Sequence, residues 1–140
     1  TWERADVGEM AAESLEGVGD GRIKMEGPRV AIPLRHGLAL SMAFFELATN
    51  AWKHGSLSVP GGSATLSWSV TGGEAPPALR LSWEEHGGPP AKTPTTKGFG
   101  SIVLRRALIA ETRGEVEIEY TDAGLRWQAS LPLERDAVHA

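Results

Sequence analysis

The sequence contains no cysteine among its 140 residues, which excludes disulfide bonds and thiolate metal sites. Long apolar runs are also missing: none approaches the roughly 20 residues that a membrane-spanning helix requires, and no signal-peptide pattern is present. Charge of one sign is not in large excess either, because the net charge is only −4. We therefore expect a cytoplasmic domain that has no nucleic-acid partner and makes no direct membrane contact.

Two common catalytic signatures are absent as well, the Gly-x-Ser-x-Gly nucleophile elbow and the Walker Gly-x-x-x-x-Gly-Lys loop. The histidines show no spacing typical of metal ligands, and we expect structural or exposed positions for all four: His36, His54, His86 and His139. We expect core and sheet packing for four of the tryptophans, Trp52, Trp68, Trp83 and Trp127.

The length suits one domain with a real hydrophobic core. Because the chain begins at Thr1 rather than at a methionine, we expect residues 1–140 to be a single domain excised from a larger protein, with its core at about 22–133.

Hydrophobic periodicity predicts helices over 4–16, about 34–54 and about 101–112. Strands are predicted over 22–33 (one or two, broken at Gly27-Pro28), 63–70, 78–83, 115–120 and 125–131. This order predicts an α+β fold, an α/β sandwich in which helices are layered on one face of a mixed, mostly antiparallel sheet. The longest irregular stretch, residues 84–100, has the length of a lid or binding loop.

The second predicted helix carries a polar stripe within an apolar stretch. Glu46, Asn50 and Lys53 fall within about 60° of one another around the helix axis. The neighbouring apolar residues cover most of the remaining circumference, so we expect a core helix whose polar groups need partners or a ligand. An amide oxygen suits Mg²⁺, a carboxylate can orient a water, and an ammonium group can meet phosphate. A solvent-facing stripe is the alternative.

Two further clusters follow. Glu84-Glu85-His86-Gly87-Gly88 ends a strand, where a carboxylate could accept hydrogen bonds from an exocyclic amine and glycines could let a flat ring approach. An ordinary acidic turn would have the same composition. "KGFGSIVL", residues 97–104, places Gly-x-Gly at the start of a helix, where free amides can bind phosphate, although glycines can also simply end a loop.

In this order the clusters resemble the N, G1 and G2 boxes of the GHKL ATP-binding fold: "ELATNAWKHG", "LSWEEHGGPP" and "GFGSIVLRRAL". More narrowly, the chain resembles the catalytic and ATP-binding domain of bacterial sensor histidine kinases of the HWE family, since Trp83 and Glu85 match its Trp-x-Glu signature. The resemblance runs from about Glu26 to Pro132. It implies a Bergerat-type fold, ATP and Mg²⁺ as ligands, phosphoryl transfer to a histidine on a separate dimerisation domain, and a response regulator as partner.

The resemblance also implies roles. Asn50 would coordinate Mg²⁺, Glu46 would support the metal's waters or the attacking group, and Lys53 would contact phosphate. Glu85 would recognise adenine, with Gly87 beside the base and residues 86–99 as the lid. The implied catalytic set is Glu46, Asn50 and Lys53, and the implied nucleotide-binding set is Asn50, Lys53, Glu85, Gly87, Gly88, Lys97, Gly98, Phe99 and Gly100.

Two departures from the family pattern matter. Phe45 occupies the N-box position where the HWE family has a histidine, and nothing in the chain matches the phosphoacceptor helix. We therefore expect the chain to hold ATP without autophosphorylating alone. A degenerate, non-enzymatic GHKL module and an anti-sigma-factor serine kinase are the rival interpretations; the Trp-x-Glu signature speaks against the second.

Overall fold

The computed structural model describes residues 3–72, 76–92 and 102–134 of the chain. Its elements are, in order, β1 (Arg4–Asp6), α1 (Val7–Ser14), β2 (Ile23–Glu26), β3 (Ala31–Pro33), α2 (Leu34–His54), η1 (Ser56–Ser58), β4 (Ser63–Val70), β5 (Ala78–His86), η2 (Ile102–Ala107), α4 (Leu108–Thr112), β6 (Glu115–Thr121) and β7 (Gly124–Pro132). The η2 segment has π-helical geometry and continues directly into α4, so the two together form the third predicted helix.

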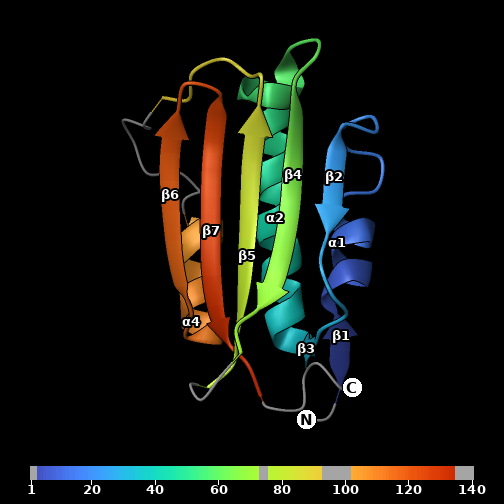
Figure 1. Cartoon of the computed structure of the whole chain (residues 1–140), viewed down its shortest axis with the longest axis vertical. Coiled ribbons are helices and arrows are strands. Elements are labelled where there is room, and N and C mark those ends of the chain that lie inside the picture. The colour runs from blue at the N-terminus through green and yellow to red at the C-terminus, as the bar shows by residue number, and fades with distance from the viewer. Residues whose placement is uncertain (1–2, 73–75, 93–101, 135–140) are drawn as a thin grey trace.

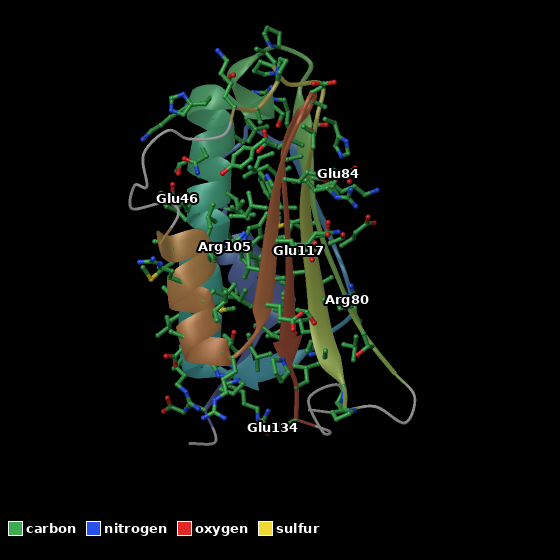
Figure 2. The ribbon with its side chains drawn as sticks, turned by 90° about the vertical axis from the view of Figure 1, so that its left-hand side faces the viewer. Glu46, Arg80, Glu84, Arg105, Glu117 and Glu134 are labelled. Atoms are coloured by element: carbon green, nitrogen blue, oxygen red, sulfur yellow. The ribbon has the colours of Figure 1, made fainter. Side chains whose placement is uncertain are left out.

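Five strands form one sheet in the order β2-β4-β5-β7-β6. β2 runs parallel to β4, and the other neighbouring pairs are antiparallel. β1 and β3 form a separate antiparallel pair. Figures 1 and 2 show α1, α2 and the η2–α4 helix as one layer on a single face of the five-stranded sheet. The predicted α+β sandwich with a mixed, mostly antiparallel sheet is confirmed.

The core lies between the sheet and the helical layer. Along β5 the buried residues alternate with less buried ones, so Leu79, Leu81 and Trp83 face the helices. The opposite face of the sheet is polar, and Figure 2 shows Arg80 and Glu84 pointing away from the helical layer. Three of the four tryptophans expected in the core are buried, namely Trp68, Trp83 and Trp127.

The α2 helix has the bounds that the sequence predicts, but only one of its faces is buried. The buried seam consists of Gly37, Leu40, Ala43, Phe44, Leu47, Ala48 and Ala51. The expectation of a helix buried all round is wrong, because α2 packs on one side of a single sheet and its other side meets solvent. Leu38, Met42 and Phe45 are 57%, 52% and 52% exposed, and Trp52, expected in the core, is 51% exposed.

Two predicted boundaries also need correction. The first helix begins at Val7 rather than at residue 4, because Arg4–Asp6 pair with β3 and the Asp6 carboxylate caps the helix by accepting the Glu9 N–H at 3.0 Å. β5 extends to His86, paired with Ser63, so residues 84–86 are strand rather than loop. Among the described residues, no helix combines the length and apolar character that crossing a bilayer requires.

Adjacent phenylalanines on α2 allow a direct test of this orientation. Phe44 is fully buried whereas Phe45 is half exposed. Phe44→Ala should lower the free energy of unfolding by about 3–5 kcal/mol, because it leaves a core cavity. Phe45→Ala should lower it by less than about 1 kcal/mol, as is usual for surface positions. Urea denaturation of both variants measures the difference, and equal losses would contradict the observed packing of α2.

Candidate functional site

The Glu85 carboxylate lies between the sheet and the end of α2. Because strand side chains alternate, Trp83 and Glu85 share the inner face of β5 while Glu84 is on the outer face. Only 4% of Glu85 is exposed. Its Oε1 accepts the backbone N–H of Ser56 at 2.9 Å, and its Oε2 accepts the indole N–H of Trp83 at 3.1 Å. A carboxylate offers about four acceptor positions, so two donors leave it able to accept from a ligand.

Two glycines allow the chain to approach this carboxylate closely. A Cβ atom at Gly55 would overlap Oε1 of Glu85, and a Cβ atom at Gly124 would lie 2.6 Å from the same oxygen. Gly124 also has φ 136°, a conformation that side chains disfavour. Side chains at these positions would displace the carboxylate, so the absence of side chains here permits the contact between Glu85 and Ser56.

Arg22 fixes the loop that follows α2. Its guanidinium donates to the backbone carbonyls of Leu57, Val59 and Gly62 at 2.9, 2.9 and 3.1 Å. One planar group with five donors can join three carbonyls of a single loop in this way. The three hydrogen bonds therefore hold the loop whose Ser56 N–H donates to the Glu85 carboxylate. Arg22 was not among the site residues predicted from the sequence.

Ser56 carries the one orphaned polar atom of the described core. Its side-chain oxygen is buried and has no hydrogen-bond partner among the described residues. Such groups cost about 1–3 kcal/mol when unsatisfied, and they mark places where a ligand or ordered water supplies the partner. Ser56 was missed at the sequence level, because a serine two residues after a helix looks like any other loop residue.

The polar stripe on α2 is present and oriented outward from the core. Glu46 and Asn50 are half-buried and Lys53 is exposed. None of the three side chains makes a hydrogen bond or ion pair with another residue in the described part of the chain. The stripe ends close to Glu85, since Ser56 lies three residues beyond Lys53 and donates to that carboxylate. The structure thus brings Lys53, the last residue of the stripe, and Glu85 of the second predicted cluster to the C-terminal end of α2.

One hollow lies beside α2 and a second lies along the sheet. One, of about 420 Å³, is bounded by Ser14, Ser41, Met42, Phe45, Glu46 and Val103, so of the predicted site residues it includes only Glu46. A larger hollow of about 610 Å³ lies along the sheet strands, and its lining, which includes Arg80, Ser82 and Gln128, contains no predicted site residue. Glu85 lines neither hollow, so the candidate ligand position of the second cluster is defined by the Glu85 carboxylate alone.

The start of the expected lid is attached to the sheet. His86 is the last residue of β5 rather than part of a lid, with its Nε2 at 3.2 Å from Thr65 Oγ1. The N–H of Gly88 donates to the carbonyl of Ala123 at 3.0 Å, and the Ala91 N–H donates to Thr121 at 2.8 Å. These backbone hydrogen bonds hold the segment that follows β5 against the turn between β6 and β7.

The two glycines that follow β5 have different surroundings. A Cβ atom at Gly88 would lie 2.6 Å from Ser56 Cα, so packing requires a glycine there. A Cβ atom at Gly87 would meet nothing closer than the Gly61 carbonyl oxygen, at 3.6 Å. Gly87 therefore leaves space beside the strand end.

The third predicted cluster, residues 97–104, lies only partly within the described residues. Lys97, Gly98, Phe99 and Gly100 lie outside the described residues, and η2 begins just after them at Ile102. Their proposed contact with phosphate stays a prediction.

The three histidines in the described part of the chain lie at the ends of α2 and β5, and none of them makes a hydrogen bond to the Glu85 carboxylate. His36 lies in the first turn of α2, about 21 Å along the helix from Asn50 at 1.5 Å per residue. Burial and the neighbouring Arg35 guanidinium lower the pKa of His36 below its ordinary value, against a weaker opposing effect of Glu111 and Glu134. His54 ends α2, His86 ends β5, and His139 lies outside the described residues.

No protein-family model matches the chain. Curated relatives do match it. The chain is 35% identical over 115 residues to a blue-light-activated histidine kinase of Brucella anthropi, covering 82% of the chain and 23% of the relative. It is 31% identical over 135 residues to the protein of the same name from Brucella ovis, covering 94% of the chain and 28% of that relative. The chain thus spans about a quarter of the length of these relatives.

Solved structures share the fold. The histidine kinase domain of a blue-light-activated histidine kinase from Erythrobacter litoralis superposes with a TM-score of 0.66 at 20% identity, covering 91% of this chain and 59% of that one. The catalytic domain of the histidine kinase ThkA superposes with a TM-score of 0.60 at 17% identity, covering 93% of this chain and 95% of that one. The second match covers nearly the whole of both chains, so the two chains share the fold along most of their length.

Proposed function

We propose that this chain, which by its relatives and its fold is a histidine kinase catalytic domain, binds ATP with Mg²⁺ for phosphoryl transfer to a histidine on another domain. The acceptor would lie on the dimerisation domain of the same protein, and a response regulator would receive the group next. The Trp-x-Glu pair at Trp83 and Glu85 supports placement in the HWE family. The observation that carries the proposal is the buried Glu85 carboxylate, held by two N–H donors beside a stripe of polar groups on α2 that have no partner among the described residues.

The donor set fits a magnesium nucleotide. Among the described residues, no group of three or more His, Cys, Asp or Glu side chains is placed to hold a metal ion by itself. Mg²⁺ in nucleotide sites characteristically takes one or two protein oxygens and completes its shell with phosphates and water. Asn50 and Glu46, one helical turn apart and half-buried, are able to supply those oxygens. The metal would then bind together with the nucleotide.

The chain's own residues would position the nucleotide. When bound, Mg²⁺ supplies neutralisation of the phosphate charge. Asn50 would hold the metal by its amide oxygen, Lys53 would direct its ammonium group to phosphate, and Glu46 would orient a metal water. Glu85 would accept a hydrogen bond from the exocyclic amine of adenine. The Ser56 hydroxyl, which has no partner among the described residues, would make a second hydrogen bond to the base. Phosphoryl transfer depends chiefly on such positioning and charge stabilisation.

Nucleotide binding and Asn50 provide the first test. Calorimetry should show ATP binding to the wild-type domain that is stronger with Mg²⁺ than with EDTA. Asn50→Ala should weaken Mg²⁺–ATP binding about 10- to 150-fold, the equivalent of about 1.5–3 kcal/mol for an interaction with a charged group. The melting temperature without nucleotide should hardly change, because the Asn50 side chain has no partner among the described residues.

Thr49→Ala is the matched control. Thr49 is the preceding residue of α2, and its hydroxyl donates to the Glu46 carbonyl of its own helix at 3.2 Å. This variant should bind Mg²⁺–ATP as the wild type does. Absence of ATP binding at millimolar concentration would reject the kinase proposal in favour of a non-enzymatic module, and a collapse of apo stability in Asn50→Ala would make Asn50 structural.

Glu85 should determine base preference. Glu85→Gln keeps the size of the side chain but replaces one acceptor oxygen with an amide donor. It should therefore lower ATP affinity by about tenfold or more, while GTP, whose base has an acceptor carbonyl where adenine has its amine, should lose less. Glu84→Gln is the control, since Glu84 lies on the opposite face of the sheet (Figure 2). Unchanged ATP affinity in Glu85→Gln would remove Glu85 from the site.

The isolated domain should not label itself. Incubated with labelled ATP and Mg²⁺, it should gain no acid-labile phosphohistidine, because nothing in the sequence matches the phosphoacceptor helix and His36 lies about 21 Å along α2 from Asn50. Adding the parent protein's own dimerisation domain should restore labelling, since docking orients the acceptor. Mass spectrometry locates any phosphate, and labelling of His36, His54, His86 or His139 in the isolated domain would refute the requirement for a separate acceptor.

A further inference from the structure

We infer that Trp83 is a positioning residue for base recognition, which acts through Glu85 and not by touching the nucleotide. The inference rests on the proposed function and adds to it a reason for the tryptophan of the Trp-x-Glu pair. Trp83 is fully buried, and its indole N–H is one of only two donors to the Glu85 carboxylate among the described residues.

The two-residue spacing follows from strand geometry. Residues i and i+2 of a strand share a face and lie about 6.6 Å apart. An indole can span that separation with its N–H, which is a donor only and must find an acceptor when buried. The in-register neighbours of Trp83 are Leu66 on β4 and Trp127 on β7, and all three residues are buried. Trp83 therefore presents its donor to Glu85 Oε2 in a fixed direction.

The other side of the carboxylate is fixed independently. Ser56 N–H holds Oε1 at 2.9 Å, from a loop that Arg22 joins to β2's N-terminal end. With one donor on each oxygen, the plane of the carboxylate is set, and its remaining acceptor directions are set with it. Glu85 makes no ion pair with any described residue, so no cation competes for those directions. A carboxylate arranged before binding can distinguish an amine from a carbonyl without reorganising.

Removing only the indole donor should therefore reduce base discrimination. Trp83→Phe keeps a buried aromatic ring but leaves Oε2 without its donor and opens space in which the carboxylate can rotate. We expect the ratio of GTP to ATP dissociation constants to fall about three- to tenfold relative to wild type, mainly through weaker ATP binding. Calorimetric titration of Mg²⁺–ATP and Mg²⁺–GTP measures this ratio. Loss of fold stability alone would weaken both nucleotides together and leave the ratio unchanged.

Trp127→Phe is the matched control. Trp127 is the direct cross-strand neighbour of Trp83, is equally buried, and also donates its indole N–H, to the Leu104 carbonyl at 3.0 Å. The chemical change is the same in both variants, but only Trp83 donates to Glu85. Trp127→Phe should keep the wild-type ratio. If both variants lower the ratio equally, or if Trp83→Phe keeps it, Trp83 is a packing residue and the inference is overturned while the proposed function stands.

A second measurement applies if Trp83→Phe does not fold. In the ¹⁵N-labelled wild-type domain, the Trp83 indole N–H resonance should shift more on adding ATP than on adding GTP, because only the adenine amine shares the same acceptor group. Glu85→Gln should shift that resonance in the apo domain, and Glu84→Gln should not. Equal shifts with both nucleotides would overturn the inference. Absence of ATP binding to the wild type would instead reject the proposed function, and the inference with it.

Discussion

The buried carboxylate of Glu85 is the constraint on which the arrangement of the site depends. Placing a carboxylate at 4% exposure without an ion pair to a described residue is costly unless N–H donors surround it. Here the donors come from β5 itself and from the loop after α2. Because both must be in place, the carboxylate fixes where α2 ends relative to the sheet. A costly polar group in an otherwise apolar core is typical of a functional position.

The α2 helix has one face that packs in the core and a neighbouring polar face that is available to a ligand. One face packs on the sheet through small and apolar residues, including Ala43, Phe44 and Leu47. The polar stripe of Glu46, Asn50 and Lys53 lies beside that face, where its groups stay unpaired within the described part of the chain. The packed face gives the stripe a rigid support, so positioning of a ligand would require no rearrangement of the helix.

The fold was largely predictable because its signals are local. The helical period set both ends of α2 correctly, between Pro33 and Gly55, and the strand signals located β4 and the start of β5. Burial of α2 was overestimated because apolar composition cannot reveal how many sheets a helix packs on. Arg22 and Ser56 escaped notice because their partners are 29 to 40 residues away in the sequence. Lys97 to Gly100 lie outside the described residues, so that part of the site stays a prediction.

The close approach of Gly55 to Glu85 has a consequence for how this sequence can change over evolutionary time. An aspartate at position 85 would be one methylene shorter and would withdraw from the Ser56 N–H, leaving that donor and the Trp83 indole unsatisfied. The nearest contact of a Cβ atom at position 55 would be Oε1 of Glu85. With the shorter aspartate at position 85, this overlap would disappear. The effects of substitutions at positions 55 and 85 must therefore be non-additive. A change from glutamate to aspartate at position 85 should therefore be better tolerated together with changes in the residues that contact the carboxylate.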